Sequence, residues 1–89
     1  MPDPQRLFQR MQRTKSGWGW AHLDRLYRGF GFEARERGPH TVYRHPKYPW
    51  LGATVARHRQ LAVGYVQDAV ELIRQLLELE RKEDENART

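Results

Sequence analysis

The apolar residues of this chain change their spacing twice, and this change restricts the possible folds more than any other feature. Up to Phe30 they recur every three or four residues, which predicts helices. From Phe32 to Ala56 they alternate in short runs separated by Gly and Pro, which predicts strands. After Gly64 the helical spacing returns. Strands enclosed by helices predict an α+β domain in which helices pack on one face of a three-stranded antiparallel sheet and leave the other face open.

The first helical segment is short. Asp3 can cap a helix by accepting a hydrogen bond from a free amide, and Pro4 suits the first helical position. The segment predicts an accessory helix within residues 1–15 that ends near Thr14. Its narrow apolar stripe consists of Leu7, Phe8 and Met11.

A second helix is predicted after the break at residues 16–19, and it begins the main core. Gly29 and Gly31 end it, since glycine readily takes the left-handed conformation found after helices. His22 lies off its apolar stripe, so we expect this histidine at the surface. The stripe consists of Trp20, Leu23, Leu26, Tyr27 and Phe30.

Three strands are predicted next. The first covers residues 32–37 and the second residues 40–44, and the turn Gly38-Pro39 joins them as a hairpin. A Pro-bounded loop over residues 45–49 leads to a third strand that starts at Trp50 or Leu51. In this third strand Ala53 and Val55 are expected on one face, and Thr54 and Ala56 on the other.

The last helix is predicted from Tyr65 to about Arg81, with a polar tail over residues 82–89 that is expected to fray. The core unit therefore spans residues 18–81, and the 89 residues form a single domain, because so short a chain has room for only one small core. The apolar face of the last helix consists of Val66, Ala69, Val70, Ile73, Leu76 and Leu77, with Leu72 and Leu79 beside it.

Charge is distributed unevenly along the chain, whose formal net charge is +5. Residues 1–60 hold twelve of the 16 Lys and Arg but only four of the 11 acidic residues. We expect the electrostatic partner of residues 1–60 to be a polyanion. The sequence contains no cysteine, no apolar run long enough to span a membrane and no signal-peptide pattern, so we expect a soluble, cytoplasmic protein.

The stretch from Gly38 to Pro46 is basic and aromatic and holds His40 and His45. The histidines lack the spacing of a metal site, so we expect no metal and no cofactor, and the chain has no nucleophile elbow and no Gly-rich phosphate loop. A positioned imidazole can exchange a proton with a ribose 2′-hydroxyl at neutral pH. His40, at the start of a strand after a tight turn, is the candidate catalytic residue, and RNA is the substrate that such chemistry needs.

Cations and aromatic residues surround this histidine in the sequence. The predicted phosphate-binding residues are Arg35, Arg37, Arg44, Lys47, Arg57 and Arg59. Three aromatic side chains can stack on bases or pack in the core, namely Tyr43, Tyr48 and Trp50. For the histidines the simpler interpretation is structural: His40 at the surface, His45 packed within its loop, and His58 bonded to a turn.

Several of these segments together resemble the HicA family of toxin ribonucleases, over roughly residues 18–78. The similarity is carried by Leu26 to Phe32, Gly38-Pro39-His40, Val42 to Pro46, Thr54 to His58 and Gly64 to Val66. It implies a fold similar to the double-stranded RNA-binding domain, helix-strand-strand-strand-helix, which agrees with the order derived above. It further implies metal-independent cleavage of mRNA and a HicB antitoxin that covers the active site.

The family's catalytic histidine stands in a Gly-Ser-His motif, which matches His40, but Pro39 occupies the serine position. Proline supplies neither the amide nor the hydroxyl that serine offers a phosphate. The helix before Ser16 and the longer, acidic last helix are additions that would suit antitoxin binding or a homo-oligomer. The resemblance implies a toxin of a type II toxin-antitoxin system. The alternatives are a non-catalytic RNA-binding module and an interaction domain for an acidic partner.

Overall fold

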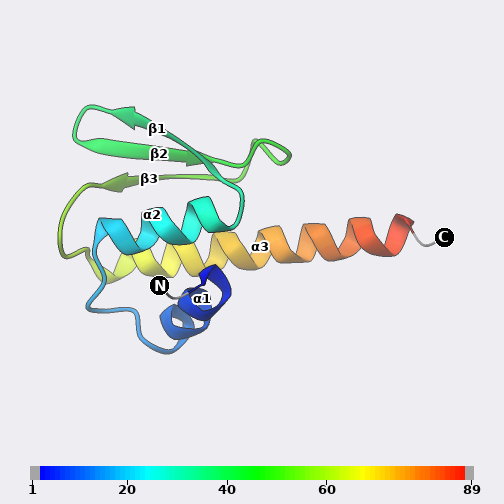
Figure 1. The fold of residues 1–89 in the computed structure, drawn as a ribbon, viewed down its shortest axis with the longest axis horizontal. Coiled ribbons are helices and arrows are strands. Elements are labelled where there is room, and N and C mark those ends of the chain that lie inside the picture. The colour runs from blue at the N-terminus through cyan, green and yellow to red at the C-terminus, as the bar shows by residue number, and fades with distance from the viewer. Residues whose placement is uncertain (1–2, 88–89) are drawn as a thin grey trace.

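The computed structural model describes residues 3–87, and the ends of the predicted accessory segment and of the predicted tail lie outside them. Three layers are stacked: a sheet, two helices that cover one of its faces, and a third helix beyond them (Figure 1). This is the α+β fold predicted from the sequence. The elements are α1 (Pro4–Arg13), α2 (Trp20–Gly29), β1 (Glu33–Arg37), β2 (His40–Arg44), β3 (Gly52–Ala56) and α3 (Val63–Ala87).

Helix α1 begins and ends as predicted. Asp3 caps it by accepting a hydrogen bond of 2.8 Å from the Arg6 amide, and Thr14 follows its last residue. Its apolar stripe is buried against α2 and α3 and not against the sheet (Figure 1). The accessory helix therefore forms an outer layer that extends the core. The buried residues of the stripe are Leu7, Phe8 and Met11.

Helix α2 has the predicted apolar stripe, with Leu23, Leu26 and Tyr27 fully buried. Gly31, with φ of +92°, turns the chain out of the helix toward the sheet. The start of α2 differs from the prediction, because His22 is not simply a surface residue. Its Nδ1 accepts a hydrogen bond of 3.0 Å from the Gly19 amide, so this imidazole caps the helix.

The strands form an antiparallel sheet in the order β1-β2-β3. Residues alternate between the two faces of a strand, and Thr41, Tyr43 and Val55 are buried against α2 and α3. No helix or strand of residues 3–87 covers the opposite face (Figure 1). The third strand starts at Gly52 instead of Trp50 or Leu51, because Leu51 closes the preceding loop by bonding Tyr48 and His45 through its backbone.

Helix α3 is longer than predicted. Its apolar face is buried as expected except at Leu77, which is 39% exposed, and the segment expected to fray stays helical as far as Ala87. Ion pairs one turn apart join Arg81 to Glu78 and to Glu85, and residues of high helix propensity continue the helix. The end of α3 extends well beyond the sheet (Figure 1). Within residues 3–87, no helix is both long and apolar enough to cross a membrane.

Candidate nucleic-acid interface

A two-residue turn, Gly38-Pro39, joins β1 to β2 and places Arg37 directly opposite His40. Gly38 has φ of +60°, and Pro39 does not have a positive φ. Positive φ at the first turn position alone is the pattern of a type II′ turn, which matches the twist of paired strands. The predicted hairpin is therefore confirmed, and its turn fixes which residues share a face.

The open face of the sheet carries three arginines, Arg35, Arg37 and Arg44. Cross-strand pairing places Arg35 opposite Val42 and Arg37 opposite His40, with all four residues on this face. The three guanidinium groups are exposed, and nothing within residues 3–87 forms a hydrogen bond or ion pair with them. They are therefore available to an external anion.

These arginines line one groove of about 490 Å³ on the open face. Glu33 is the single acidic residue in its lining, against three arginines. Three arginines with one counter-charge leave the groove positive, which suits a phosphate backbone. The groove is lined by Glu33, Ala34, Arg35, Arg37, Val42, Arg44, His45, Pro46 and Pro49.

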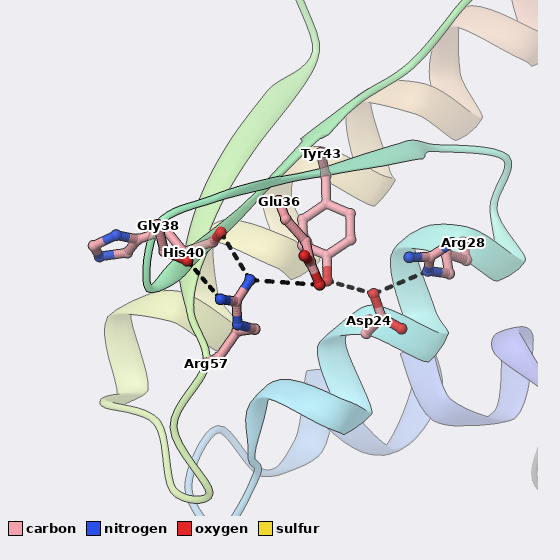
Figure 2. Close-up of polar contacts among 7 residues, drawn as sticks. All are labelled: Asp24, Arg28, Glu36, Gly38, His40, Tyr43 and Arg57. Atoms are coloured by element: carbon pink, nitrogen blue, oxygen red, sulfur yellow. Dashed lines mark hydrogen bonds and ion pairs between the residues drawn. The ribbon is translucent and has the colours of Figure 1, made fainter.

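His40 lies at the end of the same face, half-buried between Arg37 of β1 and Ala56 of β3. Directly opposite residues in antiparallel strands have Cβ atoms about 5 Å apart, so Arg37 is an immediate neighbour. The His40 ring points away from Arg57 and the helices (Figure 2). Among the described residues the ring has no hydrogen-bond partner. The imidazole is therefore free to meet a ligand bound on the open face.

Arg57 lies on the other side of the hairpin end (Figure 2). Its Nη1 donates to the backbone carbonyl of His40 at 3.2 Å, and its Nη2 donates to the carbonyl of Gly38. Glu36 lies 3.9 Å from the guanidinium. Arg57 was predicted to bind phosphate, but its donors already hold the turn that carries His40.

Lys47 and Arg59 lie apart from the three arginines of the open face. The Lys47 ammonium forms an ion pair of 2.5 Å with Glu83 of α3, and this hydrogen bond raises the Lys47 pKa. Arg59 lies in the loop after β3, beside a separate hollow at the start of α2 that Gly19 and His22 also line. Of the six predicted phosphate-binding residues, the fold thus gathers Arg35, Arg37 and Arg44 into one groove.

The aromatic candidates divide between core and surface. Tyr43 is fully buried, and its hydroxyl donates a hydrogen bond of 2.6 Å to Asp24, which also binds Arg28 at 3.0 Å (Figure 2). Burial, reinforced by this hydrogen bond, raises the Tyr43 pKa. Tyr48 is buried as well, whereas Trp50 is 69% exposed. Only Trp50 of the three can offer a ring face to a base.

Searches of known protein families, curated proteins and solved structures found no match to this chain. Within residues 3–87 no cluster of three or more His, Asp or Glu side chains has the arrangement of a metal site.

The remaining histidines have structural contacts. His45 is buried, with its ring edge-to-face against Phe32 at 5.2 Å, and its Nδ1 accepts from the Lys47 amide at 3.2 Å. The carbonyl of His58 accepts a hydrogen bond from the Trp20 amide at 2.9 Å, which ties the end of β3 to the start of α2. The structural interpretation of both residues agrees with these contacts. His45 also lines the arginine groove, whereas His40 stands opposite Arg37 at the end of the open face, outside the lining of that groove.

Proposed function

We propose that this protein is an RNA-cleaving toxin of the HicA type that binds RNA on the open face of its sheet. The observation that carries the proposal is the groove formed by Arg35, Arg37 and Arg44, whose guanidinium groups are unpaired within residues 3–87. If these arginines served only the fold, they would form ion pairs with carboxylates of the protein. As they stand, the phosphates of a bound RNA would neutralise their charges.

His40 supplies the chemistry in this proposal. It stands opposite Arg37, which lines the arginine groove, and a backbone phosphate held by Arg37 would bring a ribose within reach of the imidazole. The imidazole would remove a proton from the 2′-hydroxyl, and the resulting oxygen would attack the adjacent phosphorus and displace the 5′-oxygen of the next nucleotide. Water would protonate the displaced oxygen, and a 2′,3′-cyclic phosphate would remain on the other fragment. Arg37 would stabilise the negative charge that develops on that phosphate.

The resemblance to the HicA family supplies the proposed partners. mRNA in the cytoplasm would be the substrate. A HicB-like antitoxin would inhibit the enzyme by covering the arginine groove and His40. An acidic surface on that antitoxin would complement the positive groove.

The binding half of the proposal is tested by titrating the labelled protein with a short single-stranded RNA and following its amide NMR signals. Signals of β1 and β2 around Arg35, Arg37 and Arg44 should shift, and those of α1 should not, because α1 lies on the far side of the helices (Figure 1). Shifts confined to α1 and α2 would contradict binding on the open face.

A second candidate is an RNA-binding module without nuclease activity. Two observations favour it: the His40 ring has no orienting hydrogen bond within residues 3–87, and Pro39 lacks the amide and hydroxyl that a phosphate could use. This module would shift RNA in a gel in a salt-dependent way and leave it intact. Failure to bind RNA even at low salt would select instead an interaction domain for an acidic protein.

A further inference from the structure

A second cleft, of about 300 Å³, lies between β3 and α3 and shares no lining residue with the arginine groove. Its charge is opposite to that of the groove, because the two charged residues in its lining are both acidic. The lining consists of Tyr27, Gly52, Ala53, Thr54, Val55, Tyr65, Asp68, Glu71, Leu72 and Gln75. A mostly basic protein thus carries one separate acidic site.

One residue in the lining of this cleft has a buried polar group without a partner. Tyr27 is fully buried, and its hydroxyl has no hydrogen bond within the described part of the chain. Its ring is stacked on Tyr43 with 4.6 Å between ring centroids, which holds the phenol in place. Burial raises the Tyr27 pKa, so the phenol stays neutral at pH 7. A buried hydroxyl without a hydrogen bond costs free energy, unless a ligand or a water molecule forms that bond.

Two carboxylates lie toward the solvent side of the cleft. Asp68 and Glu71 are one turn apart on α3, so they project from the same side of the helix. Both residues are exposed, and neither forms an ion pair within residues 3–87. Burial raises the Tyr27 pKa, and the negative charge of Asp68 raises it further.

The walls of the cleft are apolar and aromatic. Val55 and Ala53 of β3 face Leu72 and Tyr65 of α3. An unbranched alkyl chain can lie against such walls while its charged end reaches an acidic group. The ring of Tyr65 can in addition attract a cation over its face.

We propose that this cleft binds an alkylammonium group, supplied by a lysine side chain of a partner protein or by a free diamine. An ammonium has three N–H donors. Asp68, Glu71 and the Tyr27 phenol oxygen offer three acceptors, and the alkyl chain would contact Val55 and Leu72.

The neighbouring backbone makes a lysine side chain feasible. Because β3 is the last strand in the sheet order, one edge of it has no strand partner among the described residues. An extended segment of a partner could pair with this edge and direct a lysine into the cleft beside it. A free diamine would need only the side-chain contacts. This site does not depend on the RNA activity proposed above.

The test compares n-butylamine with n-butanol, which has nearly the same shape and no charge, by NMR titration of the whole protein. Butylamine should shift the signals of Tyr65, Asp68 and Glu71 saturably, and butanol should not. Asp68→Asn should weaken butylamine binding about tenfold, because it removes a negative charge, and Tyr27→Phe about fivefold, because it removes the phenol oxygen. Glu80→Gln is the matched control, since Glu80 is an exposed acid on α3 outside the cleft.

Equal responses to butylamine and butanol, or none to either, would overturn the proposal. The same holds if Glu80→Gln weakens binding as much as Asp68→Asn. The source of the ammonium is distinguished by comparing cadaverine with a short extended peptide that contains one lysine. Tighter binding of the peptide would indicate a partner's side chain, and tighter binding of cadaverine would indicate a free diamine.

Discussion

The guanidinium of Arg57 donates a hydrogen bond of 3.2 Å to the backbone carbonyl of His40, seventeen residues earlier in the chain. Through a second bond to the carbonyl of Gly38, the same side chain closes the turn that carries His40 (Figure 2). Arg57 therefore acts on the histidine through the backbone, without touching its ring. This relationship separates Arg57 from the arginines of the open face.

Replacing Arg57 should loosen the end of the hairpin. Arg57→Ala is expected to lower the free energy of unfolding by about 1 kcal/mol, because two hydrogen bonds to carbonyls are lost at a partly exposed site. Chemical denaturation measures this change. Arg59→Ala is the control, since Arg59 is exposed in the adjacent loop, and it should change stability by less than about 0.5 kcal/mol. Equal losses from both variants would contradict the role assigned to Arg57.

The arginines of the open face should control how RNA affinity depends on salt. Each of Arg35→Gln, Arg37→Gln and Arg44→Gln should reduce the slope of log affinity against log salt by about 0.7 for single-stranded RNA, because one phosphate contact is lost. Fluorescence anisotropy over a range of salt concentrations gives the slopes. Arg13→Gln removes the same charge from exposed α1 and should leave the slope unchanged. A reduced slope in this control would mean that binding is not confined to the open face.

Glu83 should limit the contribution of Lys47 to RNA binding. The two side chains form an ion pair, which raises the pKa of Lys47 and lowers that of Glu83. Glu83→Gln is expected to increase RNA affinity at low salt by freeing the ammonium, while Lys47→Gln should cost less affinity than Arg35→Gln. Glu80→Gln, which removes a nearby exposed acid of α3, serves as the control. If both acidic substitutions raise affinity equally, the change reflects net charge alone.

Stability should fall at alkaline pH because of two buried tyrosines. Burial raises the pKa of both Tyr27 and Tyr43 above the ordinary value of 10.0. Above about pH 10 the unfolded chain loses phenolic protons that the folded protein retains, so the free energy of unfolding decreases as pH rises. Below about pH 10 this contribution is fully present.

Denaturation curves between pH 9 and pH 11 should show this decrease, at no more than about 1.4 kcal/mol per pH unit for each tyrosine. Tyr43→Phe should make the decrease shallower, and at neutral pH it should cost about 1 kcal/mol through loss of the bond to Asp24. If the free energy of unfolding of Tyr43→Phe decreases with pH as steeply as that of the unmodified protein, groups other than Tyr43 cause the decrease.

The fold followed from the sequence because the spacing of apolar residues and the turn residues agreed. The alternation across Gly38-Pro39 predicted the hairpin, and in the structure this hairpin pairs Arg37 with His40. Helix ends were less predictable. Helix α3 reaches Ala87 because charged residues in its polar end form ion pairs one turn apart. The spacing of apolar residues does not predict such pairs.

The candidate site was only partly predictable. The six predicted phosphate-binding residues were named together, and the different role of Arg57 depends on carbonyl groups of a distant turn. The Lys47–Glu83 ion pair likewise joins residues 36 positions apart, and no local pattern signals such a contact. The cap formed by His22 did have a local signal, because a polar side chain at the third helical position can reach back to the residue before the helix.

The most direct test of the central claim is cleavage of a labelled single-stranded RNA by the purified protein and by its His40→Ala variant, in the presence of a metal chelator. We expect the protein to cut the RNA, to leave a matched 2′-deoxy strand intact, and to lose at least about 100-fold in rate in the variant, while the variant still binds the RNA and stays folded. Equal cleavage by the protein and a folded His40→Ala variant, or cleavage of the 2′-deoxy strand at the same rate, would contradict the account.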